Sequence, residues 1–139
     1  RLTIDGGPGS NRIFSVEAGS NVTINDVKLT GGNGGGTTFS GNGGAILVNG
    51  TGTVLNLNRV HVTGNSGSDG GGLCNYFAVV NVNDSTFENN TSTSQGGGIA
   101  TGGTGTITTI NNTTISGNSS SGFFGAGGIM QFVAGTLII

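Results

Sequence analysis

The chain has 139 residues, of which 31 are glycine and one is proline, and its formal net charge at neutral pH is −2. Its four basic residues are too few to form the positive stripe that follows a nucleic-acid backbone, so we expect no nucleic-acid partner. No apolar run approaches the roughly 20 residues that cross a bilayer as a helix, so we expect no membrane-spanning segment.

Short segments that alternate apolar and polar residues start near the N-terminus. Leu2-Thr3-Ile4 is predicted to be a strand of the same type as residues 22–24, and residues 12–14 take the place that a glycine run holds later in the chain. Alternation over so few residues, bounded by glycine and asparagine, is typical of strands, and no segment has helical periodicity.

A ten-residue pattern then occurs four times, at residues 22–31, 55–64, 80–89 and 108–117. The offsets are 33, 25 and 28 residues (22 to 55, 55 to 80, 80 to 108). Each copy holds two short strands separated by a corner, which is Asn25-Asp26 in the first copy. Self-similarity at this period indicates a solenoid, in which each repeat buries its apolar side only against its neighbours.

Glycine runs ending in an apolar residue recur at residues 43–46, 70–73, 96–99 and 126–129, and residues 135–139 match residues 105–109. One turn of chain therefore contains three extended pieces, roughly 45–48, 54–57 and 60–62 in the second turn. The pattern predicts an all-β fold, a parallel β-helix with three short strands per coil. We expect about four full coils plus partial terminal coils, forming a single domain over residues 1–139.

The apolar positions of the repeat are predicted to point inward in stacked columns, and Lys28, His61, Thr86 and Thr114 to point outward. The predicted core consists of Val22, Ile24, Val27, Leu29, Ile46, Leu55, Leu57, Val60, Val62, Leu73, Val80, Val82, Phe87, Ile99, Ile110, Ile115 and Ile129.

One asparagine precedes the corner in every repeat: Asn25, Asn58, Asn83 and Asn111. Asparagines in register can hydrogen-bond amide to amide along the axis. They can also bond the local corner backbone. In both cases we expect a structural ladder outside any active site.

The pattern of residues 96–118, a Gly-Gly-Gly-Ile run followed by alternating residues and Asn-Asn-Thr-Thr-Ile, resembles the right-handed parallel β-helix repeats of large bacterial secreted and surface proteins. These include polymorphic outer-membrane proteins and autotransporter-like adhesins. The resemblance implies an extracellular or cell-surface location and a structural or adhesive role as a rod, coat or filament subunit. It implies no catalytic motif. The partners that it implies are glycans or a host or cell surface.

An alternative function rests on the corner residues Asp26, Arg59 and Asp84, which the repeat places in one column. Carboxylates on adjacent coils could bind or cleave a polysaccharide by acid–base chemistry. Charge compensation between stacked corners produces the same column without any catalysis. His61 is the single histidine, so we expect no metal site, and nothing in the sequence predicts a cofactor.

The segments after the third strand of each turn vary in length, and such inserts often form the interaction face of a solenoid. Phe39, Phe123 and Phe124 lie in them, either packed against the coil wall or exposed to a partner. Glycosylation sequons begin at Asn21, Asn49, Asn90, Asn112 and Asn118.

The first and last segments, residues 2–4 and 137–139, are both apolar and both lie inside the repeat. Uncovered strand edges pair readily with another chain. We therefore expect self-association end to end, or continuation of the solenoid in a longer chain.

Overall fold

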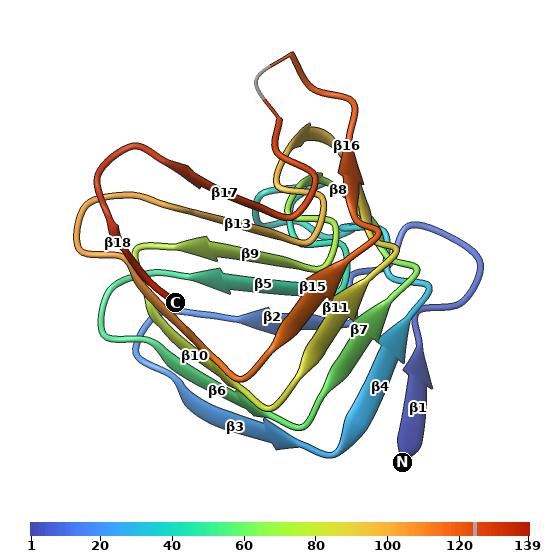
Figure 1. Ribbon diagram of the computed structural model, residues 1–139, viewed down its shortest axis with the longest axis horizontal. Coiled ribbons are helices and arrows are strands. Elements are labelled where there is room, and N and C mark those ends of the chain that lie inside the picture. The colour runs from blue at the N-terminus through green and yellow to red at the C-terminus, as the bar shows by residue number, and fades with distance from the viewer. Residues whose placement is uncertain (124) are drawn as a thin grey trace.

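The computed structural model describes residues 1–123 and 125–139, and Figure 1 shows a parallel β-solenoid of about five turns. The described residues form 18 strands and no helix, which confirms the predicted fold class. Every strand pair in the structure is parallel.

Three five-stranded sheets run along the axis and enclose the core (Figure 1). Sheet A consists of β1 (Leu2–Asp5), β4 (Val27–Thr30), β7 (His61–Thr63), β11 (Thr86–Glu88) and β15 (Thr114–Ser116). Sheet B consists of β2 (Phe14–Val16), β5 (Ile46–Asn49), β9 (Leu73–Tyr76), β13 (Ile99–Gly102) and β17 (Ile129–Phe132). Sheet C consists of β3 (Asn21–Asn25), β6 (Val54–Asn58), β10 (Val79–Asn83), β14 (Ile107–Asn111) and β18 (Thr136–Ile138).

One left-handed residue directly follows each of the strands β3, β6, β10 and β14 of sheet C, at the corner that leads into sheet A. The φ angles are 57° at Asp26, 54° at Arg59, 50° at Asp84 and 44° at Asn112. Asparagine and aspartate tolerate this conformation, because their short side chains bond locally. The chain bends sharply at this corner (Figure 1), and both flanking strands keep their apolar side chains toward the core.

The core lies between the three sheets, and all seventeen predicted core residues belong to it. Twelve of them are buried, and Val22, Ile24, Val27, Ile115 and Ile129 pack against it while partly exposed. The five are in the end coils, where fewer strands cover them. The core also takes in Val16, Ala45, Val48 and Ala78, which were not among the predicted core residues.

The prediction for the first strand was wrong. Residues 2–5 pair with β4 in sheet A, with Leu2 opposite Val27, and not with the strands of sheet C. Strands of both sheets show the same alternation, so the alternation cannot separate them. The glycine that follows the strand does separate them, because Gly6 follows β1 as Gly31 follows β4. The Gly6 N–H donates to the Thr30 carbonyl at 2.9 Å.

A fourth sheet, sheet D, forms where the sequence predicted variable loops. It contains β8 (Ser66–Asp69), β12 (Thr91–Gln95) and β16 (Ser119–Ser120). Figure 1 shows sheet D rising beside the outer side of sheet B. Serine and threonine hydroxyls dominate these strands, so their pairing leaves no apolar pattern in the sequence.

Candidate functional site

The corner column Asp26, Arg59, Asp84 and Asn112 is an exposed row of paired side chains. Arg59 donates from Nε and Nη2 to the two carboxylate oxygens of Asp26, at 2.7 Å each. Asn112 donates to Asp84 at 2.6 Å. The Arg59 hydrogen bonds hold the pKa of Asp26 below its usual range. A carboxyl with a lowered pKa is a poor general acid, so the geometry favours charge compensation in this column.

The four asparagines before the corner are linked along the axis. Asn58, Asn83 and Asn111 each donate from Nδ2 to Oδ1 of the asparagine one coil earlier, at 2.8, 3.0 and 3.0 Å. The axial arrangement is therefore the one present. This outer ladder lies on the surface of sheet C, and its amides satisfy one another.

A second ladder, which the sequence analysis missed, runs inside the turn between sheets A and D. The Nδ2 of Asn65 donates to Oδ1 of Asn90 at 3.0 Å, and the Nδ2 of Asn90 donates to Oδ1 of Asn118 at 2.9 Å. Asn65 and Asn90 are buried. The available signal was an asparagine two residues after each of the strands β7, β11 and β15, at positions 65, 90 and 118.

The inner ladder also decides which sequons reach the surface. Asn90 is fully buried and its amide is bonded to Val62 and Asn118, so this position cannot carry a glycan in the folded protein. Asn118 is half-buried and bonds the Phe87 carbonyl. Asn21 and Asn112 are exposed and Asn49 is half-buried.

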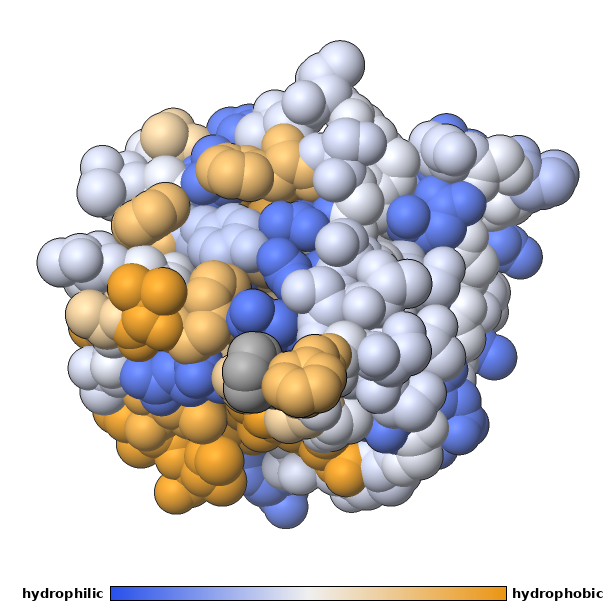
Figure 2. Space-filling view, turned by 90° about the horizontal axis from the view of Figure 1, so that it is seen from above, coloured by the Kyte–Doolittle hydropathy of each residue, from blue (hydrophilic) through white to orange (hydrophobic). Residues whose placement is uncertain are grey.

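The outer side of sheet B carries a second apolar cluster. Leu47, Cys74 and Ala100 occupy equivalent positions in three coils and are fully buried on this side. Tyr76 and Phe132 lie beside them. Figure 2 looks onto this face, where orange patches alternate with polar groups. Burial raises the pKa of the Cys74 thiol, which keeps it protonated and unreactive.

Four aromatic rings gather on this face around Tyr76. Its ring centroid lies 5.3 Å from Phe39, 5.5 Å from Phe132 and 6.3 Å from Phe77. Phe39 is 47 % and Phe77 is 41 % exposed. Phe39 thus packs against the coil wall and also presents ring surface to solvent. Phe123 is 94 % exposed, and Phe124 lies outside the described residues.

Arg12 holds the segment 34–42 across the outer side of sheet B. Its Nε donates to the Asn42 carbonyl at 3.0 Å, and its Nη2 donates to the carbonyls of Gly34, Thr38 and Phe39 at 3.2, 3.0 and 2.8 Å. Burial lowers the pKa of Arg12. The guanidinium is therefore a structural clasp whose Nε and Nη2 donors are already used.

A polar row follows the line where sheet B meets sheet D. The Tyr76 hydroxyl donates to Oδ2 of Asp69 at 2.8 Å and accepts from Nδ2 of Asn42 at 3.1 Å. Oδ1 of Asp69 and Oε1 of Gln95 are buried, and they have no hydrogen-bond partner among the described residues. Burial is the first cause of a raised pKa at Tyr76, so its phenol stays protonated.

A second left-handed column lies at the turn that follows sheet B. The φ angles are 104° at Gly50, 62° at Phe77, 104° at Gly103 and 61° at Val133. Each follows the last residue of its sheet B strand, and those last residues pair in register. Glycine is the expected residue at such a position. Phe77 and Val133 are therefore strained, and both are exposed.

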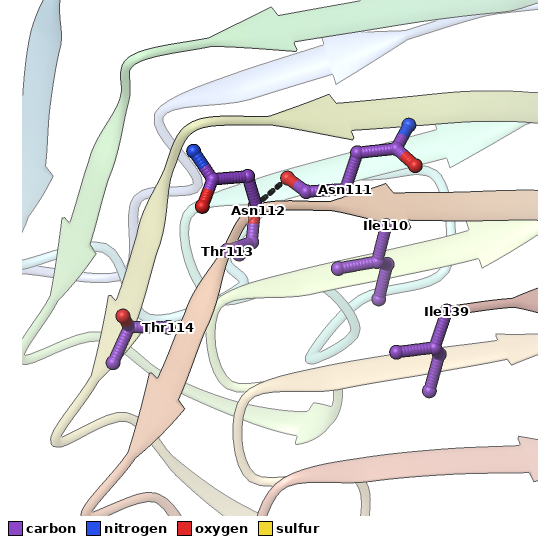
Figure 3. A pocket seen from close by; sticks show the side chains of 6 residues that line it. All are labelled: Ile110, Asn111, Asn112, Thr113, Thr114 and Ile139. Atoms are coloured by element: carbon purple, nitrogen blue, oxygen red, sulfur yellow. Dashed lines mark hydrogen bonds between the residues drawn. The ribbon is translucent and has the colours of Figure 1, made fainter.

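Among the described residues, one hollow lies at the end of the solenoid and another lies beside the clasp. The first, of about 400 Å³, is lined by Ile110, Asn111, Asn112, Thr113, Thr114 and Ile139 (Figure 3). It lies where the last coil meets solvent. The second, of about 220 Å³, is lined by Arg12, Ser15, Glu17 and residues 35–38.

Across residues 1–123 and 125–139, no three His, Cys, Asp or Glu side chains lie close enough together to hold a metal ion. The same residues contain no helix of the length and apolarity that crossing a bilayer requires.

No model of a known protein family matches the chain, and neither a curated protein nor a solved structure matches it.

Proposed function

We propose that the protein is a non-catalytic structural or adhesive β-solenoid module that works at the cell exterior, as a rigid rod with one binding face. The observation that carries the proposal is the contrast between its surfaces. The side chains on the outside of sheet C bond one another in ladders. The outer side of sheet B instead holds a cluster of aromatic rings, two of them more than two-fifths exposed.

The two asparagine ladders support a role as a rigid rod. One ladder runs on the surface and the other in the interior, and each links successive coils by side-chain hydrogen bonds. In a solenoid each repeat contacts only its neighbours, so stiffness depends on the bonds between adjacent coils. Ladders at two corners restrain both bending and twisting.

The alternative, polysaccharide cleavage by the corner column, receives little support. Asp26 is held by Arg59 and Asp84 accepts from Asn112. The test is incubation of the protein with pectate, xylan and chitin, followed by measurement of new reducing ends and unsaturated sugars. Product that disappears in Asp26→Asn would overturn the non-catalytic proposal.

The solenoid's two end faces bear on assembly. Leu2 at one end and Ile138 and Ile139 at the other are 67 %, 50 % and 84 % exposed. Figure 2 shows a broad apolar area along its lower edge, where the last coil lies. Coils continuing across both faces, from a second copy or from further chain, would bury these side chains.

Adhesion is tested by coating beads with the protein and measuring their retention on the surface of cells of the source organism under flow. Labelling intact cells with an antibody tests the exterior location. Negative-stain electron microscopy of the native material tests assembly, and we expect rods longer than about five coils. Beads that detach like uncoated ones would contradict the adhesive role.

A further inference from the structure

We propose that the ring cluster on the outer side of sheet B is a binding site for an uncharged polysaccharide chain, stacked on Phe39 and Phe77. This inference deepens the proposed adhesive function, on which it rests, by assigning the ligand class and the residues that contact it. It places carbohydrate recognition on a different face from the corner column of Asp26, Arg59 and Asp84.

The first observation is that glycines in one coil make room for rings from the coils on either side. A Cβ added at Gly103 would lie 2.6 Å from the Phe77 ring, and one added at Gly102 would lie 2.9 Å from the Phe132 ring. The two rings therefore lie against bare backbone of the coil between them. With Tyr76 they form a platform that spans neighbouring coils.

The second observation is backbone strain at the two exposed rings. Phe77 has a φ of 62° and Phe39 a φ of 40°, in the left-handed region that bulky residues rarely adopt. The positions equivalent to Phe77 in the coils before and after it are Gly50 and Gly103. A strained bulky residue where glycine would fit indicates a role outside folding, since such strain concentrates at binding sites.

The third observation is that the apolar side chains of β5, β9 and β13 on this face, other than the rings, are inaccessible to solvent. Leu47, Cys74 and Ala100 are fully buried, whereas Phe39 and Phe77 keep much of their surface in solvent. An apolar protein segment would need aliphatic surface or pockets for its side chains. Flat rings separated by amides and hydroxyls suit a sugar, which has apolar C–H faces and hydroxyl edges.

The charged side chains on this face favour an uncharged polysaccharide over an acidic one. Arg12, the cation on this face, already donates to four backbone carbonyls. Asp69 is bonded to Tyr76. The carboxylate of Asp69 on this face would repel an acidic polysaccharide, whose own carboxylates would also lose hydration. The side-chain amides of Asn42 and Asn49, both half-buried, lie at the rim, where they can meet sugar hydroxyls.

The test is isothermal titration of the whole protein with cellohexaose and chitohexaose, and with a hexamer of galacturonic acid as the charged probe. We expect a neutral hexamer to bind and the charged hexamer not to bind. Phe77→Gly and Phe39→Ala should each weaken binding about tenfold, because aromatic stacking contributes on that scale. Leu2→Ala is the control, because Leu2 is an exposed apolar residue of sheet A away from the ring cluster, and it should bind like the wild type.

Phe77→Gly separates a binding role from a structural one, since glycine relieves the left-handed backbone. We expect its thermal unfolding midpoint to stay near the wild-type value while sugar binding weakens about tenfold. Absence of binding to both neutral hexamers, or equal binding by wild type and both ring variants, would overturn the proposal. Bead adhesion that persists in Phe77→Gly would overturn the sugar site and leave the adhesive function standing.

Discussion

Asn65 donates two hydrogen bonds to the side-chain oxygen of Asn90 in the next coil. Oδ1 of Asn90 accepts from the backbone N–H of Asn65 at 3.1 Å and from its Nδ2 at 3.0 Å. Both residues are buried, so water cannot replace a lost partner. The pair fixes the start of sheet D against the end of sheet A.

Asn90→Ala should therefore lower the free energy of unfolding by about 2–4 kcal/mol, because it removes the acceptor of the buried Asn65 N–H and the amide donor to the Val62 carbonyl. The matched control is Asn83→Ala in the outer ladder, where water can reach the partners and the loss should be about 1 kcal/mol. Urea unfolding followed by circular dichroism measures both. Equal losses for the two variants would show that the ladders do not differ in burial.

Val133→Gly should stabilise the protein. Valine at a φ of 61° costs about 1–2 kcal/mol relative to its favoured backbone, and glycine carries no such cost. The side chain is 77 % exposed, so little packing is lost. We expect the free energy of unfolding, measured with urea, to rise by about 1 kcal/mol. The control is Val54→Gly in a strand of sheet C, for which the free energy of unfolding should fall. A decrease for Val133→Gly would place the valine in a contact outside the described coils.

Cys74 reports on the Arg12 clasp. The thiol is fully buried and its pKa is raised by that burial, so the native protein should react with Ellman's reagent only slowly. Arg12→Ala removes four hydrogen bonds that hold segment 34–42. Each bond to a charged group contributes about 1.5–3 kcal/mol, so the reaction should accelerate at least about tenfold. Arg59→Ala is the control and should leave the rate unchanged. Protection of Cys74 in Arg12→Ala would mean that the segment is held by its other contacts.

The Asp26–Arg59 pair should be visible in an acid titration. Its hydrogen bonds lower the folded-state pKa of Asp26. Any stability from the pair is thus present above the unfolded pKa of about 3.9 and is lost as pH falls through the folded value. Arg59→Ala should raise the Asp26 pKa toward about 3.9, as measured by carbon-detected NMR. An unchanged pKa in the variant would mean that solvent, and not Arg59, sets the ionisation of Asp26.

Leu57→Ala should destabilise by about 2–5 kcal/mol. Leu57 is fully buried, with Ile24 and Val82 at the equivalent positions of the coils on either side. Those coils are held apart by backbone ladders, so the cavity cannot collapse. A loss below about 1 kcal/mol, with unchanged cooperativity, would indicate that the core relaxes.

The repeat predicted the fold because the apolar residues that alternate at period two are the same residues that stack on their equivalents in the neighbouring coils. Leu57 and Val82 could be placed inward from their alternation alone. Sheet D could not be predicted, because strands such as β8 and β12 are made of polar residues and owe their pairing to Asn65 and Asn90 at their starts. The ring cluster was missed for a related reason. Phe39 and Phe132 are 93 positions apart in sequence (39 to 132), and only the coil stacking brings both to Tyr76.

The two asparagine ladders point in opposite directions. In the outer ladder each amide donates toward the first coil, as Asn58 does to Asn25. In the inner ladder the amide-to-amide bonds run toward the last coil, as from Asn65 to Asn90, while the same Nδ2 groups also donate to carbonyls of the preceding coil. Aligned amides are aligned dipoles, and in a helix such dipoles add to partial charges at the ends. Here the amide-to-amide bonds of the two rows run in opposite directions, so their dipoles partly offset each other as coils are added.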